Sequence, residues 1–187
     1  PKGALIIGGP NIHYDKSEIQ SWMIKHDFVD FLIETEAEVV CNNIIEKLFE
    51  NYFDVEKIKS NPIQGCYFLD KDKNLCFEKP ILLKELHDIP SPYLTGLMDE
   101  FLLNDVNGFE LLPLIERTRG CPFSCTFCNE GDIKFNRIRS FSTDRIMEEI
   151  DYIALLLKKH NRKASSLMIT DQNFGSLKED VLVSEKL

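Results

Sequence analysis

Apolar residues in the first part of the chain follow two patterns, short continuous runs and steps of three and four residues. The runs Ala4–Ile7 and Phe28–Ile33 predict buried strands, and the first leads into a tight loop at Gly8-Gly9-Pro10. The steps predict two amphipathic helices, one capped by Asp15 or Ser17 and one over residues 38–53. The expected apolar faces comprise Ile19, Trp22 and Met23 in the first helix and Val40, Ile44, Ile45, Leu48, Phe49 and Tyr52 in the second. This alternation is typical of a parallel, doubly wound α/β sheet.

The middle of the chain contains a predicted hairpin and then a segment without regular periodicity. The runs Ile63–Asp70 and Leu75–Glu78 are joined by the turn residues K-D-K-N and predict a β-hairpin. Residues 80–110 contain three prolines and no sustained period, so we interpret them as an interdomain linker. The expected domains are therefore residues 1–79 and 111–187.

The last part of the chain predicts a strand, a helix and a second strand. Leu111–Thr118 and Ser166–Thr170 are the expected strands, and Ser142 or Thr143 caps the helix between them. The buried stripe of that helix is expected to be Ile146, Ile150, Ile153 and Leu157, and Glu148 and Glu149 are expected on its polar face. This order matches the first βα unit of a βα barrel and the strand after it, so the loops that follow the two strands should open on one face.

Charge and composition limit the function classes. The chain has 22 basic and 31 acidic residues, a net charge of −9, which argues against a nucleic-acid or anionic-membrane surface. No apolar run approaches the roughly 18 residues of a membrane span. There is no signal-peptide pattern, so we expect a cytoplasmic protein with reduced cysteines. Both chain ends lie inside expected elements, which suggests a fragment.

The stretch R-G-C-P-F-S-C-T-F-C places three cysteines, Cys121, Cys125 and Cys128, within eight residues. Thiolates are soft ligands suited to iron–sulfur clusters or zinc. A structural zinc site usually has four ligands, and Cys66, Cys76 or His160 could supply a fourth. Three cysteines could instead hold a four-iron cluster in which one iron has no protein ligand. A zinc-stabilised, non-catalytic interaction module remains the alternative.

The cysteine spacing, with an aromatic residue before the third cysteine, resembles the signature of the radical S-adenosylmethionine (SAM) superfamily. The runs P-S-P-Y-L-T-G, I-E-R-T-R-G, N-R-I-R-S-F-S, E-E-I-D-Y-I-A and D-Q-N-F-G resemble members that carry a cobalamin-binding domain in front. The resemblance implies that residues 1–79 are part of a Rossmann-like cobalamin-binding domain. It also implies that residues 111–187 begin a radical SAM partial TIM barrel.

The resemblance further implies that Cys121, Cys125 and Cys128 ligate a [4Fe-4S] cluster whose fourth iron is chelated by SAM. The reduced cluster would cleave SAM to a 5′-deoxyadenosyl radical. An electron donor such as flavodoxin or ferredoxin and a small-molecule or biosynthetic-intermediate substrate are implied as partners. Only two barrel strands are expected here, so we expect the fragment to be inactive by itself.

Several residues near the motif have implied roles. Phe127 matches the position that contacts the adenine of SAM, and Asp171 and Asn173 match polar positions near SAM or substrate. A simple helix-capping loop would explain the last two equally well. Arg137 and Arg139 could meet an anionic group or form a solvated pair.

The front domain keeps part of the cobalamin pattern. Gly8 and Gly9 match a di-glycine turn that lets the backbone approach the nucleotide tail, although any tight βα turn favours glycine. Thr35 and Ala37 stand where the family has two glycines. The segment that would carry the cobalt-ligating histidine would precede Pro1, so we expect weak cobalamin binding.

Overall fold

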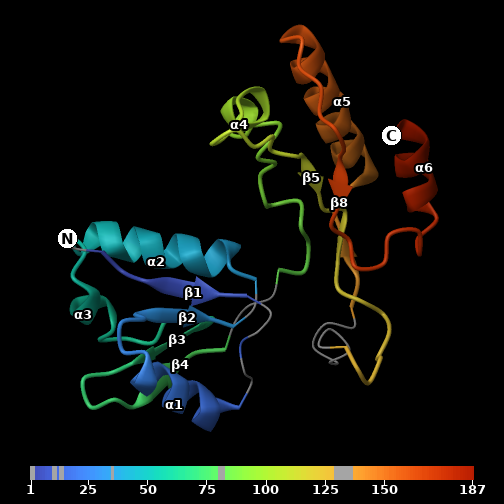
Figure 1. The fold of residues 1–187 in the computed structure, drawn as a ribbon. Helices are drawn as coiled ribbons and strands as arrows, with labels where there is room; N and C mark the ends of the chain where they lie inside the picture. The colour runs from blue at the N-terminus through green and yellow to red at the C-terminus, as the bar shows by residue number, and fades with distance from the viewer. Residues whose placement is uncertain (1–2, 10–11, 13–14, 35, 80–82, 129–136) are drawn as a thin grey trace. The chain divides into compact units, whose positions relative to one another are not determined.

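The computed structural model describes residues 3–9, 12, 15–34, 36–79, 83–128 and 137–187. The chain divides into two compact units, Pro1–Leu83 and Lys84–Leu187, which we describe separately (Figure 1). Within the described residues, every helix is too short or too polar to cross a bilayer.

The first unit is built on a four-stranded sheet in the order β1-β2-β3-β4. Its strands are β1 (Ile6–Gly8), β2 (Phe31–Ile33), β3 (Cys66–Leu69) and β4 (Leu75–Phe77). Strands β1 and β2 are parallel, whereas β2–β3 and β3–β4 are antiparallel, so the expected hairpin is confirmed. The sheet is thus mixed rather than wholly parallel, and the short turn after β3 accounts for the antiparallel β3–β4 pair.

Two helices cover opposite faces of this sheet (Figure 1). Helix α1 (Lys16–Lys25) is capped by Asp15, whose carboxylate accepts from the backbone N–H groups of Ser17 and Glu18. Helix α2 (Glu38–Glu50) lies on the other face and is followed by the short α3 (Val55–Ile58). The two cores alternate along the strands: Phe31 and Ile33 pack with α2, and Leu32 packs with α1.

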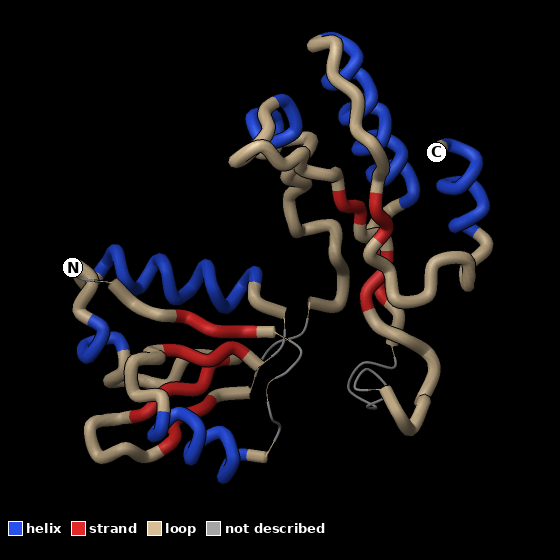
Figure 2. Tube along the Cα trace, viewed as in Figure 1, coloured by secondary structure: helices blue, strands red, loops and turns tan. Residues whose placement is uncertain are grey.

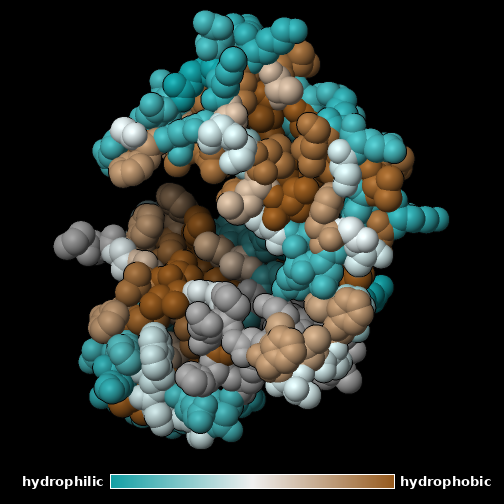
Figure 3. Space-filling view, turned by 45° about the vertical axis from the view of Figure 1, so that its right-hand side comes forward, coloured by the Kyte–Doolittle hydropathy of each residue, from teal (hydrophilic) through white to brown (hydrophobic). Residues whose placement is uncertain are grey.

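The apolar face of α2 is narrower than its sequence predicts. Val40, Ile44 and Leu48 are buried, whereas Ile45 and Phe49 are exposed. The helix also ends before residue 53, because Tyr52 and Phe53 adopt left-handed backbone angles. Hydrophobic side chains are visible on the surface in Figure 3, shown in brown.

The second unit contains the predicted strand–helix–strand unit. Strands β5 (Leu114–Ile115) and β8 (Met168–Ile169) pair in parallel, with α5 (Thr143–Lys159) between them in the chain. Short strands and long connections are characteristic of this unit (Figure 2). Helix α4 (Asp99–Leu103) precedes β5, and α6 (Glu179–Lys186) follows β8.

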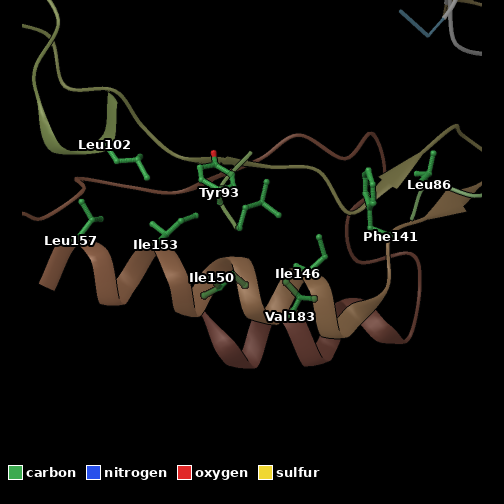
Figure 4. Packing of buried hydrophobic residues seen from close by; sticks show 10 residues of the cluster. Leu86, Tyr93, Leu102, Phe141, Ile146, Ile150, Ile153, Leu157 and Val183 are labelled. Carbon is green, nitrogen blue, oxygen red and sulfur yellow. The ribbon is translucent and has the colours of Figure 1, made fainter. Parts of the chain in front are cut away.

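Helix α5 organises the core of the second unit. Ser142 caps it, its oxygen accepting from Arg145 N, as the sequence predicts. The expected stripe is buried and points toward Tyr93 and Leu102 (Figure 4). Its members are Ile146, Ile150, Ile153 and Leu157.

The stretch predicted as a linker, residues 80–110, differs in the structure. The boundary between the two units falls between Leu83 and Lys84 in the chain, and Leu86, Tyr93 and Leu102 are buried in the second unit. The Tyr93 hydroxyl donates to the Leu114 carbonyl at 2.8 Å. Prolines remove the regular period from such a segment, but its scattered apolar side chains still anchor it.

Candidate metal centre

The cysteine loop of the second unit lies between two short paired strands, which we call the base of the loop. Strands β6 (Thr118–Arg119) and β7 (Arg139–Ser140) pair antiparallel, with Thr118 opposite Ser140. Gly120 then adopts φ 92°, a left-handed conformation that favours glycine directly before Cys121. The base thus holds together the two ends of the loop, although residues 129–136 lie outside the described part.

All three loop cysteines are free thiols near the surface. Cys121 is half-buried, and Cys125 and Cys128 are exposed. A turn joins the last two, since Cys128 N donates to the Cys125 carbonyl at 3.1 Å. Phe127 within this turn is 91% exposed. Among the described residues, no three His, Cys, Asp or Glu side chains gather closely enough to hold a metal ion.

The other three cysteines belong to the core of the first unit. Cys66 is buried, and loss of solvation raises the pKa of its thiol to about 12. Burial, and then the charge of Asp70, raise the pKa of Cys76. Cys41 and Cys76 pack against the same cluster that contains Cys66. These thiols therefore serve as small apolar groups rather than as thiolate ligands.

Asp171 connects the loop after β8 to the base of the cysteine loop. Its Oδ1 accepts from the backbone N–H of Arg117 at 2.7 Å, and its Oδ2 accepts from Thr118 Oγ1 at 2.7 Å. Since β5 and β8 are parallel neighbours, the segments that follow them leave from the same end of the pair. The sequence does not indicate this contact, because its partners are 54 and 53 residues apart.

A buried ion pair lies beside this connection. Arg117 is 3% exposed, and its Nη1 lies 2.5 Å from Oδ1 of the buried Asp180. The other oxygen of Asp180 accepts from Gly175 N at 2.8 Å and from Leu177 N at 2.9 Å. The sequence analysis did not predict a role for Arg117 or Asp180. The one signal in the sequence was the charge of Arg117 at the end of an apolar run.

Asn173 lies between these two attachments. Its side chain is half-buried, and Nδ2 is shielded from solvent with no hydrogen-bond partner in the described part of the chain. A buried donor without an acceptor is costly, so a ligand that supplies one would be favoured here.

The remaining polar residues near the motif differ from one another. Arg137 is exposed, and Arg139 lies in β7 opposite Arg119. Glu149 was expected on a polar helix face but is buried, where it accepts from Arg145 Nε at 3.0 Å. An i, i+4 partner explains how this carboxylate is tolerated in the core.

The di-glycine turn of the first unit has one position that requires glycine. Gly9 has φ +127°, and a Cβ there would meet nothing within 4 Å, so backbone conformation rather than crowding selects glycine. A Cβ at Gly8 would make an ordinary 3.5 Å contact with the Ile33 carbonyl. Ala37 adopts φ −93°, which suits any residue, and Thr35 lies outside the described residues.

Comparison with known proteins identifies relatives along the whole chain. The chain is 28% identical over 188 residues to the cobalamin-dependent radical SAM methyltransferase TokK of Streptomyces tokunonensis. It is 26% identical over 192 residues to the 2-(S-pantetheinyl)-carbapenam-3-carboxylate methyltransferase of Streptantibioticus cattleyicolor. Each match covers 100% of this chain but 26% of the relative, so the chain spans about a quarter of their length. No protein-family model matches the chain.

The fold has a counterpart among solved structures. The cobalamin-dependent SAM radical enzyme OxsB, with aqua-cobalamin and SAM bound, superposes with a TM-score of 0.63 at 19% identity. The match covers 96% of this chain and 22% of that one. The similarity confirms the predicted resemblance: the chain is related over its full length to cobalamin-dependent radical SAM enzymes. The two relatives matched by sequence are both described as methyltransferases.

Proposed function

We propose that the chain is part of a radical SAM enzyme in which Cys121, Cys125 and Cys128 ligate a [4Fe-4S] cluster. The observation that carries this proposal is the division of the six cysteines. Three are packed in a hydrophobic core, and the other three lie on one surface loop. Soft thiolate donors at this spacing fit an iron–sulfur cluster.

The residues around the loop fit a SAM molecule beside the cluster. We assign the unpartnered Asn173 amide as a donor to SAM and the exposed Phe127 ring as its contact to the adenine. Asp171, as part of the same site, would hold the loop that carries Asn173. A reduced cluster held by these cysteines would supply the electron for cleavage of SAM to methionine and a 5′-deoxyadenosyl radical. The protein residues bind and orient SAM for that cleavage.

The same proposal covers the domains and partners. Residues 1–79 correspond to part of a Rossmann-like cobalamin-binding domain, in which Gly8 and Gly9 let the backbone approach the cofactor. Residues 111–187 correspond to the start of a radical SAM partial TIM barrel. By analogy with its relatives, the whole enzyme would use cobalamin and methylate a small molecule. Flavodoxin or ferredoxin would supply electrons in the cytoplasm.

Anaerobic reconstitution with iron and sulfide tests the cluster assignment. We expect a brown protein with broad visible absorption and about four irons per chain. Reconstitution with zinc serves as the comparison. A colourless chain that takes up no iron but binds one zinc per molecule would refute the proposal and support the zinc-stabilised module instead.

A further inference from the structure

One carboxylate joins the two loops of the proposed site. Asp171 follows β8 and opens the loop that carries Asn173. Its two oxygens accept from Arg117 N and from Thr118 Oγ1, both at 2.7 Å. Thr118 is buried and lies three residues before Cys121. Hydrogen bonds to a charged group are stronger than those between neutral groups. The two bonds to Asp171, which we call the bridge, therefore hold the two loops together strongly.

The far end of the same loop is attached separately. Asp180 accepts from the backbone N–H groups of Gly175 and Leu177, and it pairs with the buried Arg117 guanidinium. Arg117 therefore contacts both attachments, through its backbone to Asp171 and through its side chain to Asp180. Asn173 lies on a short segment that is fixed at both ends against the base of the cysteine loop.

We propose that Asp171 and Thr118 are positioning residues that set the spacing between Asn173 and the cysteine loop for SAM binding. The inference rests on the proposed function, because it assumes a cluster on the three cysteines. A ligand that spans two loops binds well only when both are held in the bound geometry in advance. The hydroxyl of Thr118 reaches neither the cluster nor SAM in this assignment, so it acts through Asp171.

The substitution Thr118→Val tests the bridge with little change in shape. It removes the donor to Asp171 Oδ2 and leaves the Arg117 N–H contact in place. After reconstitution of the whole chain, the iron content should equal that of the wild type. The SAM concentration that half-converts the electron paramagnetic resonance spectrum of the reduced cluster should rise about tenfold, equivalent to about 1.4 kcal/mol. Thr118→Ser keeps the hydroxyl and should restore the wild-type response.

A matched control is available in the same unit. Thr95 Oγ1 donates to the Ser91 carbonyl at 2.7 Å, and Thr95→Val should leave the SAM response unchanged. An unchanged SAM response in Thr118→Val, or an equal shift in Thr95→Val, would overturn the inference alone. Loss of iron in Thr118→Val would also overturn it, because the residue would then support the cysteine loop itself. The proposed function and this inference would both be overturned if the reconstituted wild-type chain held no iron. The same would follow if SAM left the spectrum of its reduced cluster unchanged.

Discussion

Alanine substitution of each cysteine separates ligands from core residues most directly. We expect Cys121→Ala, Cys125→Ala and Cys128→Ala to abolish the cluster, because each removes one of the three proposed protein ligands. The corresponding changes at Cys41, Cys66 and Cys76 should leave the iron content unchanged. A cluster that loses a thiolate leaves an iron undercoordinated, and the other three described cysteines are packed in the core of the first unit.

The structure gives the magnitude for Cys66. Burial raises the pKa of the Cys66 thiol to about 12, so at pH 7 it is almost entirely protonated and a metal would bind it only at the cost of removing that proton. Its loss instead affects folding, because Cys66→Ala removes one fully buried group from a packed core. We expect a cost of about 1 kcal/mol, similar to one buried methylene. Cys125 and Cys128 are exposed, and their substitution should change the stability of the metal-free chain by less than about 0.5 kcal/mol.

Two measurements on the same six variants check this reasoning. Iron and sulfide per chain after anaerobic reconstitution report on the ligands, and urea unfolding of the metal-free chains reports on the core. The ranking of the variants by iron content should be opposite to their ranking by free energy of unfolding. The loop variants should have the least iron, and Cys66→Ala should be the least stable. Retained iron in Cys125→Ala together with lost iron in Cys66→Ala would refute the assignment.

Two further predictions concern the ion pair and cobalamin. Asp180→Ala leaves the buried Arg117 guanidinium with only its longer 3.7 Å contact to the half-exposed Glu179, and it should destabilise the chain by about 3 kcal/mol in urea unfolding. Asp105→Ala, which breaks the more exposed 2.6 Å pair with Arg162, should cost at most about 1 kcal/mol. Equal losses in the two variants would contradict the buried-pair argument. The 187-residue chain should show no saturable spectral shift with micromolar hydroxocobalamin, since Thr35 and Ala37 stand where the cobalamin-binding pattern it resembles has glycines. A saturable shift that Gly9→Val abolishes would contradict this expectation.

Elements with local signals were predictable from the sequence. Helix α5 (Thr143–Lys159) begins after its predicted cap, Ser142, and buries the predicted stripe. The α1 cap at Asp15 and the β3–β4 hairpin follow for the same reason, because capping and turn residues act within a few positions. The stripe of α2 was predicted too broadly, since periodicity does not show how wide a face its sheet can cover.

Contacts between distant residues were not predictable in this way. The sequence places Glu149 on a polar helix face and leaves Asp171 as either a helix cap or a ligand contact. Their structural roles depend on where Arg145 and Thr118 lie in the fold. The pairing of Arg117 with Asp180 joins residues 63 positions apart, and no single-sequence pattern carries that information.

The candidate site combines both kinds of information. The three proposed ligands lie within eight residues of one another, so their spacing alone indicates the chemistry. The position of that loop relative to Asn173 depends on hydrogen bonds that Asp171 makes to residues more than fifty positions away. A motif match therefore argues for the cluster, whereas only the fold can argue for SAM placement. For this reason cluster content and SAM response should vary independently among variants of the bridge, and together among variants of the three cysteines.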